Sequence, residues 1–186
     1  LMKDFAEKYK SATDEFLNLV NSLSEDDLDK SDSEGWTPRQ VIHHMADSEA
    51  QSYARLRRLI AEPGTTIQGY DESKWAENPI LNYKSEAIED SLSVIRAVRQ
   101  SSFELIKRIT EHELQNSGIH SEAGNYSVKD WLETYTKHPQ DHANQIKKQI
   151  FLKFQCIDLL MTDIVLTNMA IYMKMLQDLK CGKIKN

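Results

Sequence analysis

Two histidines, His138 and His142, stand four residues apart in the stretch TYTKHPQDHANQI. In a helix each residue turns the chain by about 100°, so the two imidazoles lie about 40° apart, on the side that also carries Trp131 and Tyr135. A buried imidazole needs hydrogen-bond partners or a metal ion, because an unsatisfied polar nitrogen costs about 1–3 kcal/mol. The spacing alone leaves two interpretations open: a metal clamp, or a pair of hydrogen-bonded histidines in a core or groove.

A further ligand must come from another element, and the stretch VIHHMADSE offers His43 and His44. On a helical wheel His44 borders the apolar face of this stretch, whereas His43 points further toward solvent. His44 is therefore the better candidate. The remaining candidates, His112 and His120, fall in a break between helices, and we expect both at the surface.

Pro139 follows His138 directly. Proline has no N–H, so it removes the helical hydrogen bond to the carbonyl of Tyr135, and it disfavours helical geometry at the residue before it. Two outcomes are open: a local kink that swings His138 toward the helix of His44 and opens space above a metal, or a kink that spoils ligation.

The spacing of apolar side chains predicts the helices that hold these residues. Apolar residues recur at steps of three, four or seven, and the chain has only six Gly and four Pro, which favours a few long helices. A Thr37–Gln40 capping box starts one helix, and Ser127 with Asp130 starts another. We expect an all-α four-helix bundle built from residues 2–23, 38–62, 85–109 and 127–150.

A long connection, GTTIQGYDESKWAENPILNY, separates the second and third predicted helices. A connection of this length inside a compact domain is more often functional than idle, and it permits a crossover in place of simple up-and-down order. Tyr70 and Trp75 lie on it. They either wall a substrate pocket or pin the connection to the bundle.

Composition and charge exclude several function classes. A net charge of −6 provides no basic face for nucleic acid, and we interpret Arg55, Arg57 and Arg58 as a solvated helix flank. Cys156 and Cys181 show neither metal-ligand spacing nor a disulfide framework, and no apolar signal segment opens the chain, so we expect a cytoplasmic protein.

The chain continues without a break into residues 151–186, which are apolar and rich in Met but interrupted by Asp158, Asp163, Asn168 and Lys174. No uncharged run approaches the ~20 residues that a membrane span needs. We therefore expect a bundle of residues 1–150 and a C-terminal helical extension, residues 151–186, that docks on the bundle or on a second copy. A homodimer is the expected assembly.

Four segments, GWTPRQVIHHMADSEAQSYARLR, YDESKWAE, HSEAGNYSVKDWL and HPQDHANQI, resemble in this order the motifs of the DinB/YfiT-like family of metal-binding four-helix proteins. The resemblance spans about residues 5–150. It implies that His44, His138 and His142 bind a divalent metal ion, zinc or nickel. The chain departs from the family pattern at Pro139, where many relatives carry glycine or alanine, and after Ile150.

Three neutral imidazoles leave a metal ion an open position, which is typical of a catalytic site. The resemblance implies a metal-dependent enzyme, thiol S-transferase-like or hydrolase-like, that activates a low-molecular-weight thiol or water against a small electrophile. Asp47 and Asp141 are candidates to orient His44 and His138, or they are plain surface carboxylates.

No further acid, base or nucleophile stands out in the sequence, so no catalytic residue is assigned. This leaves two alternatives. One is a non-catalytic metal-binding or interaction protein, with residues 151–186 as an oligomer interface. The other is a helical bundle without a metal.

Overall fold

The computed structural model of the chain describes residues 2–31 and 35–150, together with the single residues 169 and 174. Residues Leu1–Gln149 form one compact unit, and the features discussed below belong to it. The predicted extension of residues 151–186 lies outside the described residues except at those two positions. Its helical structure, its role and the homodimer stay predictions.

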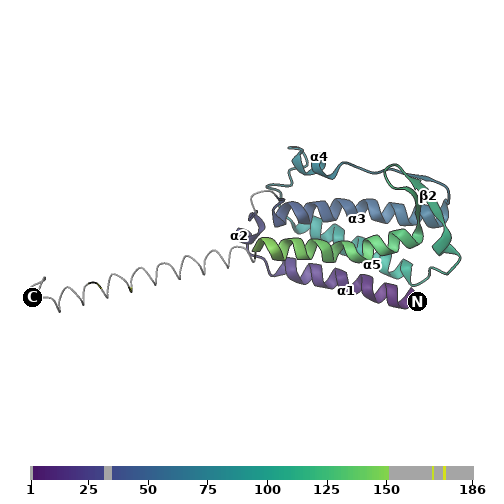
Figure 1. Ribbon diagram of the computed structural model, residues 1–186, viewed down its shortest axis with the longest axis horizontal. Coiled ribbons are helices and arrows are strands. Elements are labelled where there is room, and N and C mark those ends of the chain that lie inside the picture. Colours follow the sequence, from purple (N-terminus) through teal and green to yellow (C-terminus); the bar gives the residue numbers. More distant parts are fainter. Residues whose placement is uncertain (1, 32–34, 151–168, 170–173, 175–186) are drawn as a thin grey trace, which may run out of the picture. The chain divides into compact units, whose positions relative to one another are not determined.

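Four long helices lie side by side and form the body of the protein (Figure 1). They are α1 (Met2–Asn21), α3 (Pro38–Ala61), α5 (Glu89–Ile106) and the helix of residues 128–150. Short helices occupy the connections: α2 (Glu25–Leu28), α4 (Glu72–Glu77) and the 3₁₀ turn η1 (Glu113–Gln115). The predicted four-helix bundle is confirmed.

The predicted helix starts are set by side-chain caps. The Thr37 hydroxyl accepts a hydrogen bond from the Gln40 N–H, and the Gln40 side chain accepts one from the Thr37 N–H. Ser127 and Asp130 cap the last long helix in the same reciprocal way. α5 begins four residues later than the expected start at Ser85, and its N-cap residue makes no side-chain cap hydrogen bond. A start without a capping residue is hard to place from sequence.

α3 and α5 run parallel to each other. His43 near the start of α3 contacts Ser91 near the start of α5, and further along, Glu49 contacts Arg99. Parallel helices cannot be joined by a tight turn, so the connection of residues 62–88 must return along the bundle. The sequence-based alternative of a crossover is therefore correct, and it explains the length of this connection.

The helix of residues 128–150 runs antiparallel to α3. Its first turn meets the second half of α3, where the Trp131 indole N–H donates to the Ser52 carbonyl at 3.1 Å. Its last turn meets the segment just before α3, where the Gln149 side chain donates to the Trp36 carbonyl. This pairing places its middle beside the first half of α3, which carries His44.

A small sheet, absent from the sequence prediction, lies where α3 ends and the last long helix begins (Figure 1). It contains β1 (Thr66–Ile67), β2 (Ser117–His120) and β3 (Gly124–Ser127), in the order β1-β2-β3, with β1 parallel and β3 antiparallel to β2. A Cβ atom at Gly118 would lie 2.5 Å from the Thr65 carbonyl oxygen, so only glycine permits this approach. The sheet ties the 62–88 connection to the end of the bundle.

The core is built from the apolar stripes of the long helices. Tyr9, Phe16, Ile95 and Trp131 are at most 1% exposed, and the Tyr9 and Trp131 rings stack at 5.9 Å between centroids. Burial of such side chains is worth about 1.5–3 kcal/mol each and holds the helix faces in register. Among the described residues, no helix is both long and apolar enough to cross a membrane.

Candidate metal centre

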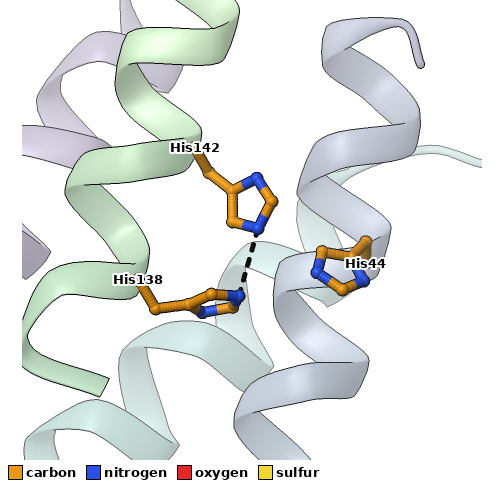
Figure 2. A group of neighbouring side chains, drawn as sticks. All are labelled: His44, His138 and His142. Atoms are coloured by element: carbon orange, nitrogen blue, oxygen red, sulfur yellow. Dashed lines mark hydrogen bonds between the residues drawn. The ribbon is translucent and has the colours of Figure 1, made fainter. Parts of the chain in front are cut away.

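Three histidines from two antiparallel helices converge between those helices. His44 comes from α3, and His138 and His142 come from successive turns of the helix of residues 128–150. One nitrogen of each ring lies within 4.8 Å of the others. Figure 2 shows the three rings directed toward a common point between the helices.

The hydrogen bonds of His142 define which nitrogen is free. His142 Nδ1 lies 2.9 Å from Gln145 Oε1, an acceptor, so a neutral His142 carries its proton on Nδ1. Its Nε2 then presents a lone pair, 3.1 Å from Nε2 of His138. Without a metal, His138 can donate to this lone pair; a bound metal would instead use both Nε2 atoms as ligands.

Two of the histidines, His44 and His142, are held uncharged by their surroundings. Burial, followed by the charges of His142 and His138, lowers the pKa of His44 to about 3. Burial, followed by the charge of His138, lowers the pKa of His142 to about 4. Both imidazoles are therefore neutral near pH 7, which is the form that binds a metal.

This donor set fits a divalent transition metal. Zinc–nitrogen bonds of about 2.0–2.1 Å at tetrahedral angles place ligand nitrogens about 3.3 Å apart, close to the 3.1 Å between His138 Nε2 and His142 Nε2. Two such bonds span at most about 4.2 Å, so a pair of nitrogens at the 4.8 Å limit would have to approach by about 0.6 Å to share one ion. His44 Nδ1 and His138 Nδ1 are buried without a hydrogen-bond partner among the described residues.

A buried carboxylate on α3, Glu49, stands behind His138. Glu49 is completely buried, and its Oε1 lies 3.9 Å from Nδ1 of His138. A carboxylate at the outer nitrogen of a metal-binding histidine orients the ring and favours the tautomer that leaves Nε2 free. Sequence reasoning missed Glu49, since a glutamate on a long charged helix resembles any surface residue until the packing is known.

Arg99 from α5 neutralises Glu49 and completes a buried polar network. Its Nη1 donates to Glu49 Oε1 at 2.6 Å, its Nη2 donates to the Tyr9 carbonyl at 3.1 Å, and its Nε donates to the Thr13 hydroxyl. Burial raises the pKa of Glu49, but the Arg99 charge and the neighbouring His138 together outweigh this and hold the pKa below its usual range. The carboxylate therefore stays ionised beside His138.

The same guanidinium replaces the helical hydrogen bond that Pro139 cannot make. Arg99 Nη1 and Nη2 each lie 3.2 Å from the Tyr135 carbonyl oxygen, the acceptor that Pro139 cannot serve. The chain stays helical on both sides of Pro139, from residue 128 to residue 150. Pro139 thus frees a carbonyl for Arg99, and His138 still faces the other two histidines.

Among the described residues, neither aspartate proposed from the sequence makes a hydrogen bond or ion pair with the histidine that it was expected to orient. Asp47 accepts a hydrogen bond from the Tyr83 hydroxyl, and Asp141 lies 3.8 Å from Lys137 on an exposed surface. The spacing along each helix suggested these two residues. Which carboxylate lies near a histidine depends instead on how the helices pack against one another.

The 62–88 connection brings a second carboxylate, Glu72 of α4, to the site. Its Oε2 lies 3.9 Å from Nε2 of His44, and burial raises its pKa above the usual range. Tyr70, two residues earlier, lines a cavity that also contains Glu72 and His138. Trp75 packs on Tyr70 with ring centroids 4.5 Å apart and does not itself line the cavity.

Several other sequence expectations are corrected. His43 is buried between α3 and α5, where its Nε2 donates to the Glu86 carbonyl and its Nδ1 accepts from Ser91. His112 is exposed as expected, but His120 is only partly exposed and lines the same cavity as Tyr70.

The arginine cluster is not a uniform solvated flank. Arg55 also lines the cavity, and Arg57 lies over the Tyr53 ring at 3.2 Å. Arg58 is exposed as expected.

The fold and this site define a four-helix bundle protein with a three-histidine group, one member of which, His138, lines a cavity. Residues 8–146 match the DinB superfamily, and the chain belongs to this family. Its expected resemblance to DinB/YfiT-like proteins is confirmed.

Two similar proteins of Oceanobacillus iheyensis are each named "Putative metal-dependent hydrolase". One is 30% identical over 77% of this chain and 82% of its own length. The other is 37% identical over 69% of this chain and 74% of its own length.

Solved structures share the fold. YfiT from Bacillus subtilis, described as "a probable metal-dependent hydrolase with an unusual four-helix bundle topology", aligns with a TM-score of 0.73 at 23% identity, covering 80% of this chain and 85% of YfiT. A DinB-like protein from Bacillus subtilis aligns with a TM-score of 0.54 at 11% identity, covering 81% and 92% of the two chains.

Proposed function

We propose that this protein is a metal-dependent enzyme in which His44, His138 and His142 bind one divalent cation, zinc or nickel. The observation that carries the proposal is the convergence of three imidazoles from two helices, with donor nitrogens within 4.8 Å of one another, beside a cavity. The names of the similar hydrolases support the metal dependence.

A divalent ion held by three neutral imidazoles keeps its full charge and an open position, and it can lower the pKa of a bound water to about 7 or stabilise a thiolate. The activated group is water in a hydrolase-like reaction or a low-molecular-weight thiol in a transferase-like reaction. The substrate is a small electrophile, in keeping with a cavity of about 200 Å³.

The chain's own residues supply positioning and proton transfer. Glu49 lies 3.9 Å from Nδ1 of His138, where its charge favours a proton on Nδ1, and Arg99 holds Glu49. Glu72, with its raised pKa, is placed to accept the proton that water or a thiol loses. Tyr70 and Glu72 of the 62–88 connection line the cavity, and Tyr70 restricts access of bulk water to it.

Metal content tests the first half of the proposal. Protein purified without an affinity tag or chelator is analysed by elemental mass spectrometry after incubation with zinc and nickel. We expect about one ion per chain in the wild type and in the exposed control His112→Ala, and loss of binding in His44→Ala and His142→Ala. A wild type that retains neither metal contradicts the proposal.

Turnover tests the second half. Metal-loaded protein is incubated with activated aryl esters, and separately with monochlorobimane and a small thiol. Hydrolysis that His142→Ala abolishes supports the hydrolase-like reaction, and thiol-dependent turnover supports the transferase-like one. Tight metal binding with no turnover in either assay favours the non-catalytic alternative.

A further inference from the structure

A small cavity adjoins the three histidines under the 62–88 connection. Its volume is about 200 Å³, which is room for roughly six or seven water molecules. Its lining comes from α3, the connection, the β2–β3 hairpin and the last long helix, and includes Ser48, Arg55, Tyr70, His120, Tyr126 and His138. Because His138 is part of this wall, a ligand in the cavity can contact one of the three histidines.

Arg55 brings a positive charge to the cavity without an acidic partner. Its Nη1 donates to the Tyr135 hydroxyl at 3.1 Å, and its Nη2 donates to the Gln68 carbonyl at 2.9 Å. Its Nε is buried and makes no hydrogen bond to any described residue. Two neutral acceptors use only part of the five N–H donors of a guanidinium, so the charge and several donors remain available.

The neighbouring wall groups are donors as well. His120 Nδ1 accepts hydrogen bonds from the backbone N–H groups of Glu122 at 3.2 Å and Ala123 at 3.3 Å, so the neutral ring carries its proton on Nε2. Burial, followed by the Arg55 charge, lowers the pKa of His120. Burial raises the pKa of Tyr126 to about 12, so its hydroxyl keeps its proton.

Glu72 is the acidic residue of the wall; the Arg55 charge acts to lower its pKa, but the two side chains form no ion pair. Within residues 2–31 and 35–150, no carboxylate oxygen lies within 4.0 Å of an Arg55 nitrogen, whereas Glu72 lies 3.9 Å from His44. The Glu72 side chain is 54% exposed and sits toward solvent. The Arg55 end of the cavity therefore lacks an anion to pair with the guanidinium.

We infer that this cavity binds a carboxylate group of the substrate, with the Arg55 guanidinium as its charged partner. A planar guanidinium matches a planar carboxylate through parallel N–H···O bonds, a geometry that lysine cannot supply. Binding of the carboxylate needs no metal. Its role, to place the reactive part of the substrate at the histidines, rests on the proposed function.

Benzoate and its neutral isostere benzamide test the inference. The full-length protein is stripped of metal with a chelator, and binding is followed by NMR through the backbone amide signals of residues 120–123. Three variants are compared with the wild type: Arg55→Met, Arg55→Lys and the control Arg58→Met, whose arginine is exposed on the same helix.

We expect benzoate to bind the wild type and Arg58→Met alike, and benzamide to bind at least about 10-fold more weakly, because charge-assisted hydrogen bonds are the stronger kind. Arg55→Met should lose at least about 10-fold in benzoate affinity, and Arg55→Lys should lose less, because it keeps the charge but not the fork. If Arg55→Met does not fold, the benzoate affinities of Arg55→Lys and Arg55→Gln are compared with that of the wild type instead.

Three results would overturn the inference: equal benzoate affinity in the wild type and Arg55→Met, equal affinity for benzoate and benzamide, or binding of inorganic phosphate without binding of benzoate. The metal-free design separates this inference from the proposed function. If the protein binds benzoate but takes up no metal, the carboxylate site is supported and the metal-dependent enzyme is rejected. If the protein takes up metal but does not bind benzoate, the carboxylate site is rejected and the proposed metal site is supported.

Discussion

Arg99 donates to the backbone carbonyl of Tyr135 through both of its terminal nitrogens, each at 3.2 Å. This carbonyl is the one that Pro139 leaves without a helical partner. The guanidinium that serves it also pairs with Glu49 at 2.6 Å, and Glu49 stands behind His138. A proline beside a candidate metal ligand is therefore linked, through one buried arginine, to the orientation of that ligand.

Replacing Pro139 with alanine tests this compensation. In an ordinary helix interior the change would gain about 3 kcal/mol, because alanine restores the hydrogen bond and removes a clash. Here Arg99 already serves the Tyr135 carbonyl, so we expect a gain well below that figure. Chemical denaturation of the metal-free protein measures it, and the full gain of about 3 kcal/mol would show that Arg99 does not compensate.

Replacing Arg99 with methionine should be strongly destabilising. It leaves Glu49 buried and unpaired and the Tyr135 carbonyl without a partner, and breaking such a buried pair costs about 3–5 kcal/mol. The double variant Arg99→Met with Glu49→Gln should recover part of the loss, because no uncompensated charge remains. Equal stability of the single and double variants in urea unfolding would argue against this ion pair.

Replacing Glu49 with glutamine should weaken metal binding by about 10- to 100-fold, because an amide orients the His138 ring less strongly than a carboxylate does. Affinity is measured by competition with a chromogenic chelator, and the visible spectrum of the cobalt-substituted protein reports on the ligand geometry.

The matched control is Asp141→Asn, which changes a carboxylate that pairs with Lys137 on the surface. We expect its metal affinity to equal that of the wild type. If Asp141→Asn weakens binding as much as Glu49→Gln does, the sequence-based assignment of Asp141 as an orienting residue is preferable.

The sequence predicts the long helices and the candidate ligands because both depend on local patterns. Apolar spacing and the Thr37 and Ser127 caps are written in neighbouring residues, and the four-residue step from His138 to His142 fixes their common side. The choice of His44 over His43 follows from the same wheel, although His43 is buried by α5 and not exposed.

The supporting residues depend on packing between elements distant in sequence, which no local pattern encodes. Glu49, Arg99 and Tyr135 meet only once α3, α5 and the last long helix are assembled. Glu72 reaches His44 only because the parallel arrangement of α3 and α5 sends the 62–88 connection back over the site. The strands of the small sheet are two to four residues long, too short for an alternating pattern to show.

Stability of the metal-free protein should fall as the pH falls below about 6.5, the ordinary histidine pKa. The folded-state pKa values of His44 and His142 are lowered to about 3 and about 4, so between pH 4 and 6.5 the unfolded chain binds more protons than the folded chain. Their stabilising contribution is fully present above the unfolded pKa and is lost toward the folded one.

Each of the two histidines should contribute a slope of up to about 1.4 kcal/mol per pH unit in this window. Urea unfolding between pH 4 and pH 7.5 measures the slope, and His44→Asn and His142→Asn should each reduce it. An unfolding free energy that stays constant from pH 7 to pH 4.5 in the wild type would contradict the burial of uncharged imidazoles at this site.

Glu72 should act in turnover and not in metal retention. Its Oε2 lies 3.9 Å from Nε2 of His44, and it falls outside the group of three nitrogens that lie within 4.8 Å of one another. We therefore expect Glu72→Gln to keep the metal content of the wild type and to lower kcat by about 100-fold or more, the contribution typical of a general base.

Because burial raises the pKa of Glu72, the acidic limb of the wild-type pH–rate profile should lie above the usual glutamate range and vanish in the Glu72→Gln variant. Loss of metal in Glu72→Gln would instead make this carboxylate a ligand, and an unchanged kcat would leave proton transfer to another group of the cavity wall.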